Sequence, residues 1–234
     1  LSVMAALQGA RVHVPGPDRT TLGPTLSQAL EPHRGAIARF ADSGTLRLSR
    51  GLATIWDDVF PMVQPPQGED GLGVIVLNSN AESHFSFTNA LGLVAEEDMQ
   101  TMLAILRRYP QARWIIALHH HPVEYPMQAK AFSERIGTAL INGSRFVRQL
   151  KPFGHRIVAM HGHRHIDWIG CCGPLRIVSA PSPVMEAKND EPTLFYVHTL
   201  AAAPDGGLAL LEPQRIDIAP EPAECAALRS RMPV

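Results

Sequence analysis

Arg156-Ile-Val-Ala-Met-His-Gly-His-Arg-His165 is the stretch that decides the fold class, because a short apolar run ends there in three histidines around one glycine. A second stretch of the same design lies upstream, Trp114-Ile-Ile-Ala-Leu-His-His-His-Pro122, and the two hold six of the eleven histidines. Such apolar runs are typical of buried strands, and strand ends in α/β folds meet at one edge of a sheet, where ligands bind. Since imidazole is the commonest metal ligand, the two stretches predict an α/β fold with a metal site.

Strands and helices alternate around these two stretches. Apolar runs at 73–77, 113–118 and 155–160 predict three strands. The segment 95–108 predicts a helix with acids in its first turn and arginines in its last, as the helix dipole favours. A further helix is predicted near 142–151. This alternation is typical of a sheet with parallel strands.

The two ends of the chain add more strands. Residues 11–14 predict a strand, and 25–40 predict a helix that Pro32 disturbs. Strands are predicted in the last third at 166–171, 174–179, 193–199 and 207–217. The order predicts a mixed sheet packed on a second sheet, with helices outside. We expect one domain over 1–219 and a surface tail over 220–234.

The composition indicates a globular chain without charge bias. Of 234 residues, 45% are hydrophobic and 18% charged, and the net charge of −1 gives no signal for nucleic acid or an anionic membrane. No apolar run is long enough to span a membrane. Cys171, Cys172 and Cys225 do not make a disulfide framework and predict a reducing, cytoplasmic compartment. The first residue is Leu1 rather than Met, which indicates removed residues or a piece of a longer protein.

Three histidines are the candidate metal ligands. His120 lies two residues before Pro122, which stops the strand and fixes the backbone. Gly162 permits a sharp turn that aims His163 and His165 at one point. Three neutral imidazoles suffice for one Zn²⁺-type ion with an open position. The alternative is that these histidines are solvated polar residues at two strand ends.

Neighbouring residues leave further alternatives open. Arg164 either meets phosphate oxygens or forms a salt bridge with a surface acid, and the sequence favours neither. The Asn-Ser-Asn segment at 78–80 favours a turn over a ligand contact. Cys171 and Cys172 lie in apolar surroundings, which favours packing over chemistry.

These motifs resemble those of the calcineurin-like metallophosphoesterase superfamily, in which His-x-Pro ends one strand and Gly-His-x-His follows the next. Here they are His120-His-Pro122 and Gly162-His-Arg-His165, and the resemblance covers residues 11–200. It implies an α/β/β/α sandwich of two mixed sheets, with two divalent ions (Mn, Fe, Zn or similar) that act on a phosphate ester. It also implies that His120 and His163 bind one ion and His165 the other. In such an enzyme we expect Arg164 to be the catalytic residue that stabilises the charge on the phosphate.

The first half of the family's site is missing. Asp-x-His, Gly-Asp-x-x-Asp and Gly-Asn-His-Asp do not occur in the chain. Residues 12–19 are similar to the approach to the third motif, but Pro17 stands at the position of the ligating Asn, which leaves Asp18 as a substitute oxygen ligand. Two dications repel without a bridging carboxylate, so we expect one ion or none. The missing strands imply that an N-terminal segment or a partner subunit completes the sheet and the site.

Three functions are compatible with the sequence. The first is a metal-dependent phosphoesterase, a phosphatase or phosphodiesterase with a phosphate-ester substrate. The second is a binding or scaffold subunit of a larger assembly, which keeps the fold without the catalysis. The third is a hydrolase with one ion on three histidines that acts on something other than phosphate. The resemblance favours the phosphoesterase, and we expect neither a nucleic-acid nor a membrane partner.

Overall fold

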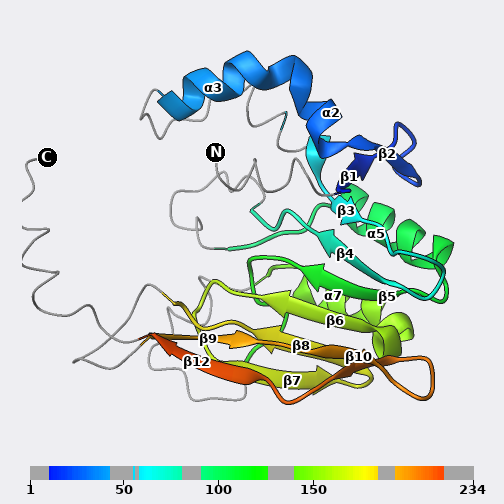
Figure 1. Ribbon diagram of the computed structural model, residues 1–234, viewed down its shortest axis with the longest axis vertical. Helices are drawn as coiled ribbons and strands as arrows, with labels where there is room; N and C mark the ends of the chain where they lie inside the picture. The colour runs from blue at the N-terminus through cyan, green and yellow to red at the C-terminus, as the bar shows by residue number, and fades with distance from the viewer. Residues whose placement is uncertain are drawn as a thin grey trace, which may run out of the picture.

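A mixed eight-stranded sheet forms the centre of the computed structural model, which describes residues 11–42, 55, 58–80, 91–125, 140–183 and 193–218 (Figure 1). From one edge to the other its strands are β2 (Leu22–Thr25), β1 (His13–Pro15), β3 (Met62–Gln64), β4 (Leu72–Val76), β5 (Arg113–Ala117), β6 (Ile157–His161), β8 (Leu175–Ser179) and β7 (Trp168–Cys172). The neighbours β4, β5, β6 and β8 are parallel, and the other pairs are antiparallel.

Two helices cover one face of this sheet. The helix α5 (Glu96–Arg108) connects β4 to β5, and α7 (Gly143–Leu150) leads through the 3₁₀ helix η3 (Lys151–Arg156) into β6. Parallel neighbours need such crossover connections. Side chains of both helices and of the strands form the largest core, in which Trp114, Ile116, Phe146 and Leu150 are fully buried. This core fixes the strands whose carboxyl ends carry the histidines.

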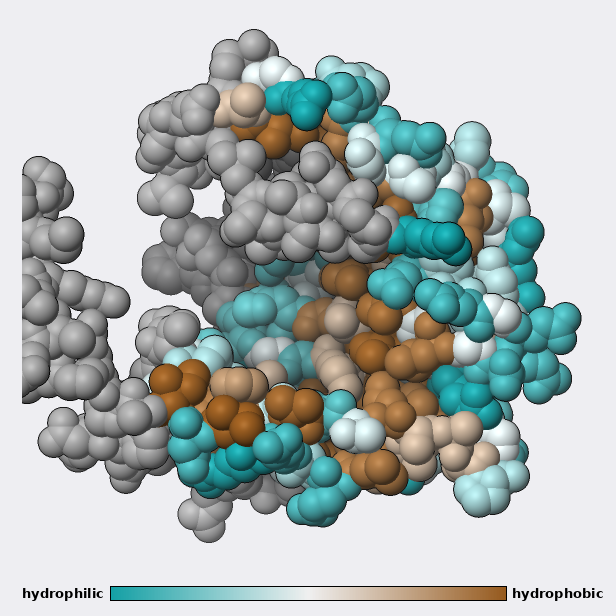
Figure 2. All heavy atoms as spheres, in the orientation of Figure 1, coloured by the Kyte–Doolittle hydropathy of each residue, from teal (hydrophilic) through white to brown (hydrophobic). Residues whose placement is uncertain are grey.

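The opposite face is covered only in part by the described residues. The hairpin of β10 (Leu200–Ala202) and β11 (Leu208–Leu210) packs on β6 and β8, with Leu208 against Val158 and Val178. The helix α2 (Leu26–Leu30), followed by η1 (Glu31–His33) and α3 (Arg34–Asp42), covers β1 at the other end. Between them Leu72 of β4 is 42% exposed, and Figure 2 shows hydrophobic side chains in the middle of this face.

A buried arginine ties the end of α5 to the beginning of β6. Arg156 is 5% exposed, and its guanidinium donates three hydrogen bonds to backbone carbonyls. The acceptors are Leu106, Tyr109 and Ala112, at 2.7, 3.1 and 2.6 Å. These carbonyls lie at and beyond the end of a helix, where no intrahelical donor is available. Arg156 is therefore a structural residue behind the site.

The predicted mixed α/β fold class is confirmed. The helices α5 and α7 and the strands β4, β5, β6, β7, β8 and β9 (Thr193–Val197) lie where the sequence predicts them, with ends that differ by at most two residues. Pro32 divides the predicted helix at 25–40 into α2, η1 and α3. Residues 1–9 and the tail at 220–234 lie outside the described residues, so the domain boundary stays a prediction.

Some predictions needed correction. The strand predicted at 207–217 is two strands, β11 and β12 (Gln214–Ile218), because Pro213 between them cannot donate to a ladder. The short strands β2, β3 and β10 were not predicted. In the described part of the chain, the second layer consists of two separate two-stranded sheets, β10–β11 and β9–β12. No helix in that part is both long and apolar enough to cross a membrane.

Candidate metal centre

The two histidine stretches meet because β5 and β6 are parallel neighbours in register. Ala117 pairs with Met160 at the carboxyl end of the ladder. Beyond it, the Leu118 amide donates to the Met160 carbonyl at 3.1 Å and the Gly162 amide to the His119 carbonyl at 3.2 Å. The residues that follow both strands are thereby held side by side, as the sequence predicts for strand ends of one sheet.

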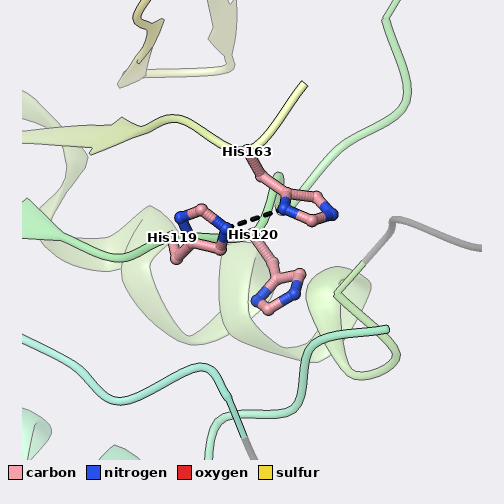
Figure 3. A group of neighbouring side chains, drawn as sticks. All are labelled: His119, His120 and His163. Atoms are coloured by element: carbon pink, nitrogen blue, oxygen red, sulfur yellow. Dashed lines mark hydrogen bonds between the residues drawn. The ribbon is translucent and has the colours of Figure 1, made fainter. Parts of the chain in front are cut away.

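Three imidazoles gather at this edge: His119, His120 and His163 (Figure 3). Their ring centroids lie 4.5 to 5.0 Å apart, and one nitrogen of each lies within 4.8 Å of the others. His163 Nδ1 and His119 Nε2 are hydrogen-bonded at 2.7 Å. His119 is exposed and His120 is 2% exposed, so the cluster has one open side.

The cluster fits a single transition-metal ion. Ion–nitrogen bonds of 2.0–2.1 Å in a tetrahedral site place two ligand nitrogens about 3.3 Å apart. His119 and His163 would therefore have to separate from 2.7 Å by about half an ångström, and their shared proton would have to leave. In the described part of the chain no carboxylate belongs to the group. The donor set is then three neutral imidazoles, which suits Zn²⁺ and similar ions.

The predicted ligands are only partly brought together. His120 and His163 belong to the cluster, whereas its third member is His119, and His165 is not part of it. His165 still lies near enough to act on His119: burial, and next the charge of His165, lower the pKa of His119. A lowered pKa keeps the imidazole in the neutral form that binds metals. The metal-ligand roles themselves stay predictions.

The backbone reverses at the histidines and not at the glycine. His163 and His165 adopt φ values of 68° and 54°, whereas Gly162 has no positive φ. For side chains other than glycine this left-handed conformation costs roughly 1–2 kcal/mol per residue. Such strain concentrates at functional sites. The predicted turn is therefore present, but the residues with left-handed backbone are His163 and His165 instead of Gly162.

Ser79 holds His120 from the end of β4. Its hydroxyl lies 3.0 Å from His120 Nδ1 and accepts the backbone N–H groups of His119 and His120 at 3.1 and 3.2 Å. Ser79 is 1% exposed. The sequence favours a turn at Ser79, and no local pattern indicates this contact, which joins residues 41 positions apart.

A second pair of histidines lies buried beside the cluster. His121 and His161 are 1% and 4% exposed, and their ring centroids are 6.4 Å apart. Burial lowers the pKa of each to about 4, so both are neutral at pH 7. Among the described residues, neither nitrogen of His121 nor Nε2 of His161 has a hydrogen-bond partner. No pattern in the sequence indicates that these two histidines are buried.

Arg164 lies over an aromatic ring at the same edge. Its Cζ is 5.7 Å from the centroid of Tyr125, whose hydroxyl is hydrogen-bonded to Ser179 at 2.9 Å. A guanidinium at this distance from a ring makes a cation–π contact. The contact keeps a positive charge near the histidines, where an anion could meet it.

Asp18 is a turn residue. Its carboxylate accepts hydrogen bonds from the side chains and backbone of Thr20 and Thr21. These bonds, with that of the Thr20 hydroxyl first, lower the pKa of Asp18 to about 2. The next residue, Arg19, pairs with buried Asp98 of α5. Asp18 does not belong to the histidine cluster, and its suggested role as a substitute ligand has no support.

Comparisons with known proteins add little to this geometry. No model of a known protein family and no curated protein matches the chain. Among solved structures, it is similar to a Staphylococcus aureus protein assigned as a 5'-nucleotidase, in complex with alpha-ketoglutarate, with 14% sequence identity and a TM-score of 0.39. The match covers 72% of this chain and 32% of that one, so the chain spans about a third of that structure. The observations define a mixed α/β protein with a three-histidine candidate metal centre.

Proposed function

We propose that this chain is the metal-binding part of a calcineurin-like phosphoesterase, which hydrolyses a phosphate ester with the help of a divalent ion. The observation that carries the proposal is the cluster of His119, His120 and His163 at the carboxyl ends of two adjacent parallel strands. A bound ion would supply Lewis acidity and lower the pKa of a water molecule. Arg164 would contact the phosphate, and its stacking on Tyr125 supports an orientation toward the site.

One ion, not two, fits the described residues. Two dications 3.5–4 Å apart repel by roughly 18 kcal/mol at an effective dielectric constant of about 20. Carboxylates normally offset this repulsion, but the described residues supply none to the cluster. In our proposal His165 becomes a ligand of a second ion, as the family resemblance implies, only when carboxylates come from another segment.

We also propose that a further layer of polypeptide, an N-terminal segment or a partner subunit, covers the open face of the sheet. Sheets of parallel strands are ordinarily covered on both faces. The described residues leave Leu72 of β4 42% exposed and its neighbours Val74 and Val76 half-buried. This face adjoins the strand ends that carry the histidines, so the same layer could supply the missing carboxylates.

The test combines metal analysis with hydrolysis assays on this chain. The His163→Ala variant should lose the bound ion and any turnover of an aryl phosphate or phosphodiester with Mn²⁺. His155→Ala is the matched control, because His155 is exposed on η3, outside the cluster. If the wild type and His163→Ala bind the same amount of metal, the proposal is wrong.

Two other outcomes would point to the other functions. One tightly bound ion together with hydrolysis of neutral esters, but not of phosphates, would favour the mononuclear three-histidine hydrolase. The membership of His119 in place of His165 favours this candidate, because all three ligands then serve one ion. No bound ion, with assembly unchanged in His163→Ala, would favour the scaffold subunit.

A further inference from the structure

We infer that Ser79 is the positioning residue of the candidate metal centre: its hydroxyl sets the tautomer and the orientation of His120, and so decides which ring nitrogen an ion can use. The inference deepens the proposed function and rests on it wherever a metal is involved. Its structural part concerns the metal-free protein alone.

The hydrogen bonds of Ser79 leave one consistent arrangement. A hydroxyl has one hydrogen to donate and two lone pairs that accept. The backbone amides of His119 and His120 can only donate, and both point at the Ser79 oxygen at 3.1 and 3.2 Å. With both lone pairs taken, the hydroxyl hydrogen goes to His120 Nδ1, 3.0 Å away. Nδ1 is then the acceptor, and the proton of the neutral ring lies on Nε2.

Burial makes this arrangement selective. Ser79 is 1% exposed and His120 is 2% exposed, so solvent does not compete for the hydrogen bond between them. The contact also fixes the position of the ring, because Ser79 is hydrogen-bonded both to the side chain of His120 and to the backbone N–H groups of His119 and His120. Serine is suited to this position, since its hydroxyl can reverse from donor to acceptor without moving the oxygen.

The reversal is what an incoming ion requires. Nδ1 faces Ser79, so an ion in the cluster would have to use Nε2, and a ligating nitrogen must carry no proton. The ring proton must therefore move from Nε2 to Nδ1. The Ser79 oxygen then accepts a hydrogen bond from Nδ1–H, and its own hydrogen no longer points at the ring. Because the oxygen has only two lone pairs, it loses the hydrogen bond from one of the two backbone amides. Metal-binding histidines usually donate their second N–H in this way.

Two substitutions separate this role from simple packing. Ser79→Ala removes the hydroxyl, whereas Ser79→Thr keeps it. Ser179→Ala is the matched control, because Ser179 is a 2% exposed serine at the same edge of the sheet whose hydroxyl pairs with Tyr125. Only the first substitution should change the state of His120.

The first experiment is nitrogen-15 NMR of the histidine rings in the chelator-treated full chain, with His120 assigned by the loss of its signals in His120→Gln. We expect the Nε2–H tautomer in the wild type, Ser79→Thr and Ser179→Ala, and a mixture of tautomers in Ser79→Ala. If Ser79→Ala does not fold, Ser79→Cys, a much weaker donor, takes its place. An Nδ1–H tautomer in the metal-free wild type, or no change on removal of the hydroxyl, would overturn the inference.

The second experiment titrates the same proteins with Zn²⁺. We expect Ser79→Ala to bind roughly 10- to 100-fold more weakly than the wild type, as is typical when the partner of a ligating histidine is removed, and Ser179→Ala to bind normally. Equal affinities of Ser79→Ala and the wild type would overturn the coupling to the ion. A wild type that binds no ion would overturn the proposed function, while the NMR result would still decide the role of Ser79.

Discussion

Gly92→Ala is the substitution that tests most directly whether the position of His120 matters. A Cβ at residue 92 would lie 2.3 Å from Cγ and 2.5 Å from Nδ1 of His120, whereas ordinary contacts begin at 3.4 Å. The ring or the backbone of Gly92 would therefore have to move by about 1 Å. The ring cannot yield into solvent, because His120 is 2% exposed and Ser79 holds its Nδ1.

The consequences for binding and stability can be estimated. Ligand distances in metal sites are held to within about 0.2 Å, so a shift of about 1 Å should weaken ion binding by about 10- to 100-fold. Overpacking in a buried region costs about 1–3 kcal/mol of unfolding free energy. Co²⁺ titration by visible absorption and urea unfolding of the metal-free protein measure the two effects separately.

Gly162→Ala is the control for this prediction. Among the described residues no atom lies within 4 Å of a Cβ built on Gly162, and its φ is not positive, so alanine should fit there. We expect this variant to retain ion binding within about threefold and stability within about 0.5 kcal/mol. If Gly92→Ala and Gly162→Ala bind Co²⁺ with the same affinity, the packing of His120 does not set the geometry of the centre.

Three further predictions concern the ligands, the pH dependence and the support behind the site. His119→Ala should weaken binding of a single Zn²⁺ more than His165→Ala does, because His119 belongs to the cluster and His165 does not. Calorimetric titration would show similar affinities for the two variants if the family assignment of the first ion, to His120 and His163, were right. The metal-free protein should lose stability as pH falls from 6.5 towards 4, by about 2 kcal/mol for each of His121 and His161. The reason is that the folded state lowers the pKa of both side chains to about 4, so the unfolded chain takes up protons first. Urea unfolding at pH 7 and pH 4.5 measures the loss, and equal free energies of unfolding would contradict it. Arg156→Leu should lower the free energy of unfolding by about 3–5 kcal/mol, because it leaves three backbone carbonyls at the end of α5 without their donor. Thermal unfolding measures this, and a midpoint within about two degrees of the wild type would show that water replaces the guanidinium.

The long helices and the central strands could be predicted because local sequence patterns determine them. Residues 96–108 carry both the charges of a helix dipole and an apolar stripe, and the apolar runs of β4, β5 and β6 are long enough to indicate buried strands. The parallel pairing of β5 and β6 then brings their histidines together. The strands β2, β3 and β10 are only three or four residues long, too short for periodicity to show them.

The membership of the cluster could not be predicted in the same way. Alternation assigns side chains to faces only within a strand, and β5 ends at Ala117, before the first histidine. Beyond β6, left-handed backbone at His163 and His165 redirects both side chains. The alternation of side chains along a strand therefore does not tell which of the histidines lie together, and it does not separate His119 from His165. The contact of Ser79 with His120 depends on the packing of β4 beside β5, which no local pattern contains.

The charge of the centre bears on the choice between phosphate esters and neutral esters. Among the described residues, the three neutral imidazoles leave a bound dication with both of its positive charges, and the guanidinium of Arg164 lies over Tyr125 at the same edge. A partly buried site with such an excess charge is costly unless an anion offsets it. A phosphate ester supplies one or two negative charges, whereas a neutral ester supplies none. The ion and an anionic substrate should then bind cooperatively, because each lowers the electrostatic cost of the other. In the part of the chain that the structure describes, no carboxylate belongs to the cluster, and this favours our proposal of a phosphate ester over a neutral ester.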